Sequence, residues 1–489
     1  MVHRESLLIN APYLSVSVLH NILFPSFLVS FWCSSRFGLA VIGFLGFINL
    51  FALRVNMSVA LVCMVNHTSS LDVNAGEFNW DKVTQGLILG SFYWGCIVTQ
   101  LPGGLLASRF GGKRVFGWCM FGCALANLLT PVGARTHVVF LMVLRVIGGL
   151  GQGVVWPAMH TLWASWAPPL ERSKLAGFTY AGSQVGNILT FPLAGLLCEY
   201  GFDGGWASIF YITGATCVVW FLAWMLLAFD TPAEHPRISV EERDYIENSL
   251  KGQMEKMSIP WFAFFKSPPV WAIVVAHTCG NWGTYTFLSN TPTYMREVLK
   301  FDIKNGVFSS LPFVGFAILI NATGFLADFL RSRALVSTTM CRKIFNSLAA
   351  LVLVLGYIDC STPYTAVALL TIGVAFTGCT VGSGFVVNHV DIAPKYAGIL
   401  FGISNTAATI PGFLAPYVIG ESEGQWRIVF YIAAGIYTFG ALFYIIFGSG
   451  DIQTVYRSLM NFMKELRHRH LQGKGELKDQ TVFSVPTLP

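Results

Sequence analysis

The sequence predicts an all-α membrane protein with twelve transmembrane helices in two halves of six. Hydrophobic residues make up 54% of the 489 residues, charged residues only 11%, and the mean hydropathy is +0.59. Ordinary soluble domains have roughly a quarter of their residues charged. A spanning helix needs about 20 apolar residues, and twelve such runs leave only short connections in this chain. No soluble domain of useful size fits between them.

The expected spans define the domain organisation. They begin near Gly38, Gly86, Arg114, Val138, Ser173, Trp206, Val270, Val307, Cys341, Tyr364, Tyr396 and Arg427. The long polar connection over residues 230–269 separates an N-terminal bundle, 38–229, from a C-terminal bundle, 270–449. Within this linker the spacing of Ser239 and Glu242 is that of a capping box and predicts a short surface helix. Basic residues among apolar ones in the tail, 450–489, predict a helix on the cytoplasmic leaflet.

Loop charge predicts which side of the membrane each connection faces. The connection after the second span contains Arg109, Lys113 and Arg114, and the one after the eighth contains Arg331, Arg333, Arg342 and Lys343. The positive-inside rule places these loops and both termini in the cytoplasm. Asn66, in an Asn-His-Thr sequon on the opposite side, is then a candidate for N-glycosylation. The net charge of +6 is spread over loops and gives no case for nucleic-acid binding.

Two further features of composition concern the N-terminus and the cysteines. In the N-terminal segment, 1–37, residues 13–33 are largely apolar but contain His20 and Pro25. We expect an interfacial or partly buried segment here; an alternative gene model or a signal-anchor explains it equally well. The eleven cysteines lie mostly in apolar runs without paired spacing. They predict core thiols, with no disulfide framework, metal site or other cofactor.

Two arginines lie inside the apolar spans. Arg54 is near the middle of the uncharged stretch 38–65, and Arg145 is inside a second one, 138–156. An arginine at a bilayer centre costs about 2.5 to 3.5 kcal/mol even on lenient scales, so it normally faces a watery cavity and marks a solute path. The two arginines therefore predict a channel or carrier for anions, with a small organic anion as partner.

An internal repeat carries a resemblance to a known superfamily. Residues 104–113 (GLLASRFGGK) follow the second span, and residues 324–328 (GFLAD) recur at the end of the eighth. Duplicated in these loops, the pattern resembles the loop signature of the major facilitator superfamily, although Ser108 stands where aspartate is usual. Residues 52–56, 100–104, 157–160, 166–175 and 388–394 narrow the resemblance to the organic anion transporter family of sialin, vesicular glutamate transporters and sodium/phosphate-type transporters. The match covers about Arg36 to Asp451 and is most similar to sialin.

This resemblance implies a secondary transporter in which two six-helix halves rock around a midplane site. Its cargo would be sialic acid, other acidic sugars or acidic amino acids, moved with protons out of lysosomes or another endomembrane compartment. Arg54 resembles the family's carboxylate-binding arginine, whose planar fork suits a carboxylate; a structural helix-to-helix bond is the alternative. Arg145, followed by Gly149 and Gly153, is a second candidate, with binding or gating and structure as open roles. Hydroxyls and amides for the ligand are expected from Tyr93, Tyr285, Ser383 and Asn388.

The coupling residues depart from the family pattern. The two span-four glutamates of sialin correspond to Gly148 and Gln152, neither of which titrates. If protons are coupled, His277 on span seven is the first candidate, because imidazole titrates near neutral pH; a bonded core histidine is the alternative. His160 and His389, near helix ends, are expected to be structural or interfacial. Pro168 and Pro169 should end span four, and Glu171 with Arg172 form either a cytoplasmic gate pair or a solvated turn.

Two other function classes stay open at this point. The first is an organic anion, urate or phosphate transporter at the plasma membrane, driven by membrane potential or by Na⁺ in place of H⁺. The second is a solute sensor that does not transport. An enzyme is not expected, because the largest outer loop has no cluster of acids or histidines. Leu7-Leu8 resembles a sorting signal but has His3 where an acid is usual, so the lysosomal address depends on the resemblance.

Overall fold

The computed structural model describes residues 32–65, 76–168, 171–250, 261–297, 306–355, 363–393, 396–421 and 426–451. Helices occupy all twelve expected spans within these ranges. The N-terminal six are α2 (Ser35–Met64), α3 (Lys82–Phe110), α4 (Gly112–Thr136), α5 (Val138–Trp166), α6 (Arg172–Tyr200) and α7 (Trp206–Leu227). The C-terminal six are α10 (Pro268–Glu297), α11 (Gly306–Ser332), α12 (Thr338–Leu355), α13 (Pro363–Gly382), the pair α15 (Ala397–Ala408) and α16 (Ile410–Glu421), and α17 (Trp426–Phe447).

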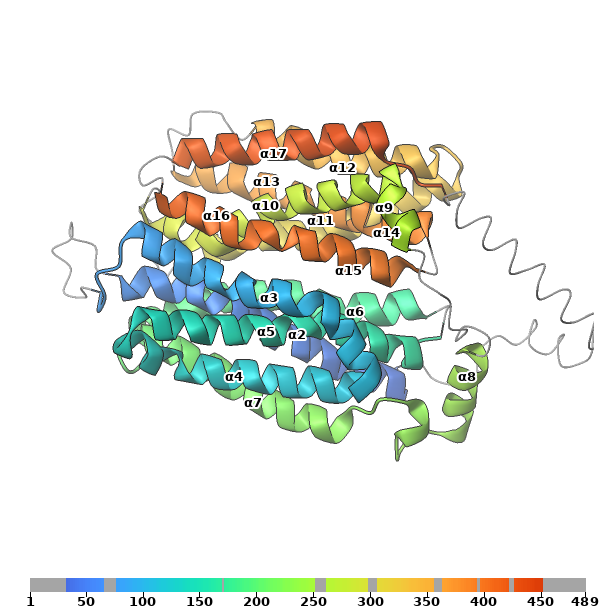
Figure 1. Ribbon diagram of the computed structural model, residues 1–489, viewed down its shortest axis with the longest axis horizontal. Coiled ribbons are helices and arrows are strands. Elements are labelled where there is room, and N and C mark those ends of the chain that lie inside the picture. The colour runs from blue at the N-terminus through green and yellow to red at the C-terminus, as the bar shows by residue number, and fades with distance from the viewer. Residues whose placement is uncertain are drawn as a thin grey trace, which may run out of the picture.

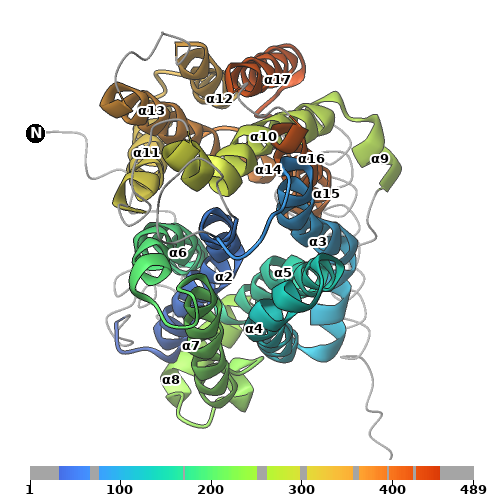
Figure 2. The same cartoon turned by 90° about the vertical axis from the view of Figure 1, so that its left-hand side faces the viewer.

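The helices form two bundles that lie side by side, as expected. In Figure 1 the N-terminal bundle is the lower, blue-to-green layer and the C-terminal bundle is the upper, yellow-to-red layer. Viewed along the helices in Figure 2, α3 lies beside α16 and α6 lies beside α11 where the bundles meet. Helices α2 and α10 also touch there. Six described segments are individually long and apolar enough to span a membrane: Ser35–Met64, Gly112–Thr136, Val138–Trp166, Trp206–Leu227, Val307–Arg331 and Val367–Ile392.

Helix boundaries follow capping residues more closely than they follow the apolar runs. Every expected span start lies within four residues of an observed one. The Ser34 hydroxyl accepts a hydrogen bond from the Phe37 amide (3.2 Å), and the Asp81 carboxylate accepts one from the Thr84 amide (3.1 Å). Such caps satisfy otherwise free amides, so α2 and α3 begin before their first apolar residues.

The eleventh span is broken, which the sequence analysis did not anticipate. Helix α15 ends at Ala408 and α16 begins at Ile410. Pro411 follows the break directly, and proline removes one intrahelical hydrogen bond and crowds the preceding turn. A further short helix, α14 (Phe385–Ile392), lies between α13 and α15.

Close packing of α5 on α3 confirms the role expected for the span-four glycines. A Cβ on Gly149 would collide with the Phe92 carbonyl, and one on Gly153 would collide with Thr99 and Cys96. Gly148, in contrast, has open space where a Cβ would be. Gly149 and Gly153 are therefore required for helix contact, whereas Gly148 is not.

We call the end of the molecule that contains the basic connections after α3 and α11 the cytoplasmic end, following the positive-inside rule. The predicted linker helix is present there as α8 (Val240–Leu250), and the Glu242 amide donates to the Ser239 hydroxyl at 3.1 Å. The Glu242 carboxylate does not complete the capping box. It accepts from the amides of Ser35 (3.0 Å) and Arg36 (3.1 Å) at the start of α2, where the helix dipole favours an anion.

A buried ion-pair cluster fixes α8 and α6 to the start of α2. Arg36 is 1% exposed, and its guanidinium contacts Glu242 at 3.0 Å and Glu171 at 2.7 Å. Tyr245 also donates to Glu171 (3.3 Å). Glu171 thus has a partner, Arg36, that the sequence analysis did not consider, and it is not in a merely solvated turn. The side chain of Arg172 lies outside the described part of the structure.

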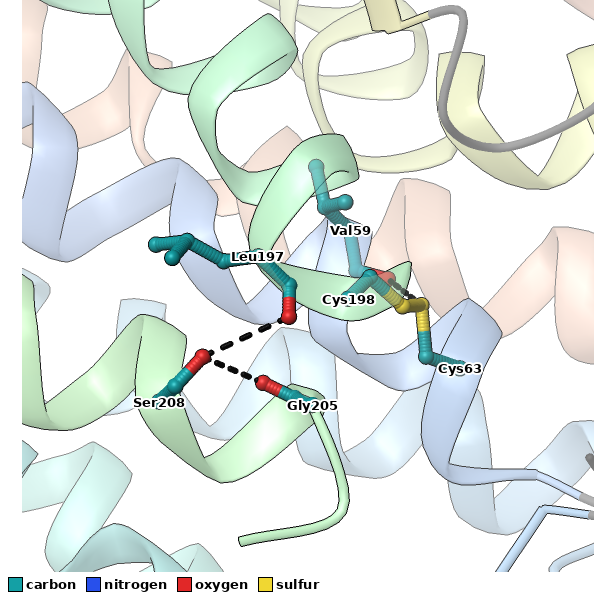
Figure 3. The surroundings of a disulfide bond; sticks show 6 residues. All are labelled: Val59, Cys63, Leu197, Cys198, Gly205 and Ser208. Atoms are coloured by element: carbon teal, nitrogen blue, oxygen red, sulfur yellow. Dashed lines mark hydrogen bonds between the residues drawn. A yellow bond between two sulfur atoms is a disulfide. The ribbon is translucent and has the colours of Figure 1, made fainter. Parts of the chain in front are cut away.

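The opposite, non-cytoplasmic end contains a disulfide that contradicts the expectation of no disulfide. Cys63, near the end of α2, is bonded to Cys198, near the end of α6, with 6.4 Å between their Cα atoms (Figure 3). The two cysteines are 135 residues apart in sequence, so their spacing could not indicate the pair. Beside the bridge, Ser208 at the start of α7 donates to the Gly205 carbonyl (2.6 Å).

An exposed ion-pair cluster joins three segments at the same end. Arg135 contacts Glu77 and Asp203, both at 2.9 Å. The hydrogen bond from Arg135 holds the pKa of the Asp203 carboxyl below its usual value. Three sequence predictions lie outside the described residues: the glycosylation site Asn66, the segment 13–33 apart from its last two residues, and the helix of the cytoplasmic tail.

Candidate functional site

Arg54 lies in a cavity between the two halves, surrounded by aromatic rings. Its guanidinium carbon is 5.0 Å from the ring centroids of both Tyr93 and Tyr285 and 5.4 Å from that of Phe92. Rings at these distances attract a cation through their electron-rich faces. The Arg54 Nε is buried without a hydrogen-bond partner, and no carboxylate among the described residues pairs with this side chain.

Arg145 adds a second positive charge to the same cavity. It projects from α5, is 8% exposed, and its guanidinium lies 4.9 Å from the Phe92 ring, so Phe92 contacts both arginines. Its Nε is also buried without a partner. In the described part of the chain, neither guanidinium is balanced by an acidic side chain. Burying two cations without acidic partners is energetically costly. A negatively charged group in the cavity would offset this cost.

The cavity wall is contributed by helices of both halves. Besides the two arginines it is lined by Val55, Ser58, Leu89, Phe92, Tyr93, Leu288 and Ser289. It is narrow, with room for about one water molecule. Helices α2, α3 and α5 provide the N-terminal wall, and α10 provides Leu288 and Ser289. A site with walls from both halves changes shape whenever the halves move relative to each other.

Sequence reasoning missed Ser58, Ser289 and Phe92. The two serines could have been predicted from helical periodicity, because residues four apart share a face of a helix. Ser58 is four residues after Arg54, and Ser289 is four residues after Tyr285. Phe92 has no comparable signal, because its contact with both guanidinium groups depends on how α3 packs against α2 and α5.

Aromatic contacts close the cavity toward the non-cytoplasmic end. The rings of Tyr93 and Tyr285, from opposite halves, have centroids 4.8 Å apart. Nearer that end, Phe191 of α6 stacks on Phe313 of α11 at 5.2 Å. Gly412 packs directly against the Tyr93 ring, and a Cβ there would collide with it. These contacts must separate before a solute could pass toward the non-cytoplasmic side.

Gln152 of α5 contacts α2 one helical turn before Arg54. Its Nε2 donates to the Leu50 carbonyl (3.1 Å), and its Oε1 is buried without a partner. An amide can hold this position by hydrogen bonding but cannot take up or release a proton. Gln152 therefore positions α2 against α5 and cannot itself carry a proton.

The structure does not bring Ser383 and Asn388 to the cavity. Ser383, between α13 and α14, donates to the Thr323 carbonyl at 2.6 Å. Asn388 donates to the Tyr444 hydroxyl (2.8 Å) and the Ser449 carbonyl (3.0 Å). Both side chains join helices near the cytoplasmic end of the C-terminal half. Their predicted ligand contacts have no support from this geometry, because neither residue lines the cavity and the Ser383 hydroxyl and the Asn388 amide nitrogen are bonded within the protein.

His277, the sequence candidate for coupling, is buried in the C-terminal half and away from the arginines. Its Nδ1 lies 3.0 Å from the Ser404 hydroxyl of α15. His160 lies on the N-terminal side, where its Nδ1 is 3.2 Å from the Tyr180 hydroxyl. In the described residues, no group of three or more His, Cys, Asp or Glu side chains could hold a metal ion.

The overall architecture is that of multi-pass membrane transporters. The xylose transporter XylE from E. coli, in an inward-open conformation, superposes with a TM-score of 0.64 at 15% sequence identity, covering 84% of this chain and 96% of that one. A bacterial homolog of the human lysosomal transporter Spinster, inward-facing and occupied, gives 0.62 at 14% identity, covering 84% and 94%. A family model described as Major Facilitator Superfamily matches residues 39–416.

Comparison with known sequences identifies the family within this class of membrane transporters. Human sialin is 45% identical over 454 residues, which cover 86% of this chain and 90% of sialin. Human vesicular glutamate transporter 2 is 43% identical over 440 residues, covering 86% of this chain and 75% of the relative. The chain belongs to the major facilitator superfamily and, within it, to the organic anion transporter family of sialin and the vesicular glutamate transporters. The relatives named here are transporters.

Proposed function

We propose that the protein is a secondary transporter of small carboxylate anions, with acidic sugars such as sialic acid as the first substrate class and acidic amino acids as the second. The observation that carries this proposal is the pair Arg54 and Arg145, buried in one cavity between the halves with no acidic partner among the described residues. A substrate carboxylate would supply the missing charge. The similarity to sialin supports the sugar acid.

The geometry supports a division of tasks within the cavity. Arg54 presents a planar fork that can form two parallel hydrogen bonds to one carboxylate. The rings of Tyr93 and Tyr285 hold this fork between the halves, and their hydroxyls can donate to the same ligand. Arg145 adds a second positive charge against the same Phe92 ring. The Ser58 and Ser289 side chains line the remaining wall and suit a ligand with several hydroxyl groups.

Alternating access follows from the weak contacts between the halves. Gln100 of α3 donates to the Thr409 hydroxyl (2.8 Å) and accepts from Asn405 (3.1 Å) at the break between α15 and α16. The Tyr93–Tyr285 contact lies on the non-cytoplasmic side of this pair of bonds. Each contact contributes about 1 kcal/mol or less, so the two bundles can separate at one end while they stay together at the other.

The source of energy divides the proposal into two forms. Similarity to sialin supports proton-linked transport at an endomembrane, with the lysosome first. The non-titrating Gln152, one turn from Arg54, favours a second form in which membrane potential alone moves the anion. The potential provides about 2.3 kcal/mol per charge per 100 mV, which is enough for about 50-fold accumulation. This second form fits a plasma membrane as well as a vesicle.

Counterflow in proteoliposomes tests the proposal. Vesicles loaded with unlabelled anion are diluted into labelled sialic acid, glucuronate, glutamate, urate or phosphate, with xylose as a neutral control. We expect exchange of at least one carboxylate, its loss in Arg54→Gln, and no change in Arg114→Gln, a matched control at an exposed cytoplasmic arginine. Exchange of xylose alone, or of no solute, would reject a carboxylate transporter. Saturable binding without exchange would indicate a sensor.

Gln152→Glu tests the second form of the proposal, in which membrane potential alone drives the anion and no proton is coupled. The substituted carboxyl can donate to the Leu50 carbonyl only in its protonated form, because a carboxylate has no hydrogen to donate. If the native protein responds to voltage and not to pH, this variant is expected to gain a dependence on the pH difference. A native protein that already concentrates the anion with a pH difference, at clamped voltage, would reject this form.

A further inference from the structure

A continuous hydrogen-bonded chain of three side chains lies inside the C-terminal half. His277 of α10 contacts the Ser404 hydroxyl of α15 at 3.0 Å through Nδ1, and the same hydroxyl contacts Nε2 of His389 of α14 at 2.8 Å. His277 is 5% exposed, His389 2% and Ser404 0%. The ring of Phe401 packs against both imidazoles, at 5.7 and 5.5 Å. Two histidines thus share one hydroxyl group in an apolar setting.

The hydrogen-bond pattern assigns the hydrogens of this chain. Nδ1 of His389 lies 2.9 Å from the Val386 carbonyl, which can only accept, so Nδ1 carries the hydrogen and Nε2 has a lone pair. The Ser404 hydrogen is shared between this lone pair and the Phe401 carbonyl, 3.1 Å away. The Ser404 oxygen then accepts from Nδ1–H of His277. Nε2 of His277 is left with a lone pair.

Other ionisable groups around the pair are engaged elsewhere. From α17, Tyr437 donates to the Gly280 carbonyl at 2.9 Å, and Tyr444 accepts from Asn388. Asp391 of α14 is paired with Arg342 of α12 at 2.7 Å. On α10 itself, Cys279 is a buried thiol, and from the opposite half His160 approaches the far side of the Phe401 ring at 6.1 Å. No carboxylate among the described residues bonds to either His277 or His389.

One face of α10 runs from this chain to the anion cavity. His277, Asn281 and Tyr285 are four residues apart and share one face of α10. Asn281 donates to the Ala408 carbonyl at 3.1 Å and lies 3.4 Å from the Tyr285 hydroxyl. Tyr285 in turn contacts Arg54. His277 and the Arg54 contact of Tyr285 thus lie two helical turns apart on one face of α10.

The same chain also adjoins a contact between the halves. Ser404 is followed directly by Asn405, which donates to Gln100 of the N-terminal half at 3.1 Å. A charge on an imidazole packed against Phe401 is costly unless the packing changes. Any rearrangement that hydrates the histidines moves Ser404, and with it the bond across the interface.

We propose that His277, Ser404 and His389 form a proton-binding site that couples proton movement to anion transport. This inference rests on the proposed function and places the coupling in the C-terminal half, because Gln152 of α5 cannot take up or release a proton. A proton from water attaches to the Nε2 lone pair of His277 and later returns to water, with no other bond made or broken. Ser404 holds the two rings in place, and the two histidines share the single added charge.

The experiment uses the full-length protein in proteoliposomes with the voltage clamped by potassium and valinomycin. One proton moving with each monovalent anion gives about tenfold accumulation for each unit of pH difference. His277→Asn keeps a donor near the Nδ1 position for Ser404 but cannot titrate. We expect accumulation to fall to about onefold, while counterflow at equal pH stays within about twofold of native. His137→Asn, an exposed histidine at the start of α5, is the matched control and should retain about tenfold accumulation.

The outcomes separate this inference from the proposed function. Tenfold accumulation by His277→Asn would show that the histidine only holds a hydrogen bond, and would overturn the inference. So would native protein that exchanges anions but does not respond to pH, a result that leaves the proposed function intact. Absence of counterflow in native protein would reject the proposed function itself. Counterflow is also the folding check, and if His277→Asn lacks it, His389→Gln takes its place with the same expectations.

Discussion

Substitution of Arg54 by glutamine is expected to weaken anion binding and, at the same time, to stabilise the empty protein. Breaking a buried ion pair by removing one partner costs about 3 to 5 kcal/mol, which corresponds to a roughly hundred- to few-thousand-fold loss of affinity. Arg145 remains in the same cavity, against the Phe92 ring, and continues to attract the anion. We therefore expect the lower end of this range, about a hundredfold.

The stability of the empty protein moves in the opposite direction. The Arg54 charge is surrounded by Phe92, Tyr93 and Tyr285 and has no acidic partner among the described residues. A glutamine there removes a buried charge, so the thermal midpoint without ligand should rise. In native protein, anion at 100 times its dissociation constant should add about 2.7 kcal/mol of stability. At the same concentration, a variant with hundredfold weaker binding should gain only about 0.4 kcal/mol.

Thermal unfolding in detergent, with and without anion, measures both effects in one assay. Arg54→Lys keeps the charge but loses the planar fork, so it should lose about ten- to a hundredfold in affinity, as expected for one charged hydrogen bond. Arg54→Gln that unfolds at a lower temperature than native and still shows the full anion-induced shift would refute the reasoning. Arg54 would then be a structural residue bonded between helices.

The remaining predictions concern the two ends of the molecule. Glu242→Gln removes one of the two carboxylates from buried Arg36 and should cost about 3 kcal/mol of unfolding free energy, whereas exposed Glu241→Gln should cost almost nothing; equal losses would contradict the assigned pairing. The bond from Arg135 lowers the pKa of Asp203, so its ionised form stabilises the fold above the unfolded value, about 3.9, and this stabilisation is lost as pH falls through the folded value. Asp203→Asn should thus lower the thermal midpoint slightly near pH 6 but not near pH 2; the same decrease at both would argue against it. Cys63→Ser should release one additional alkylatable thiol under non-reducing denaturation and destabilise the fold by about 2 to 4 kcal/mol; an unchanged thiol count would exclude the bridge.

The number of helices and the division into halves could be predicted from the sequence, because both depend on local composition. Apolar runs of spanning length and clustered loop charges need no tertiary information. Gly149 and Gly153 were likewise identified as contact residues from their spacing alone. The break at Thr409 was missed because the apolar run continues across it, although Pro411 was visible.

The candidate site could be predicted only in part. A charge within an apolar run is a local signal, so Arg54 and Arg145 were found, and the structure brings both to one cavity together with Tyr93 and Tyr285. Ser383 was selected by residue type, which does not reveal that its hydroxyl already has a partner.

Pairings between distant segments were missed for a related reason. Arg36 with Glu242 and Cys63 with Cys198 join residues separated by 206 and 135 positions. No local pattern encodes such a distance along the chain. The chain from His277 to His389 was missed in the same way, because it needs a serine from a third helix.

The Cys63–Cys198 bridge has a consequence for how the protein is made. A disulfide forms in an oxidising compartment, so the bond can close only after the end of α6 has crossed to the non-cytoplasmic side. A closed bridge therefore requires that the ends of α2 and α6 that carry Cys63 and Cys198 both lie on the non-cytoplasmic side. A chain inserted with these ends in the cytoplasm would keep both thiols reduced.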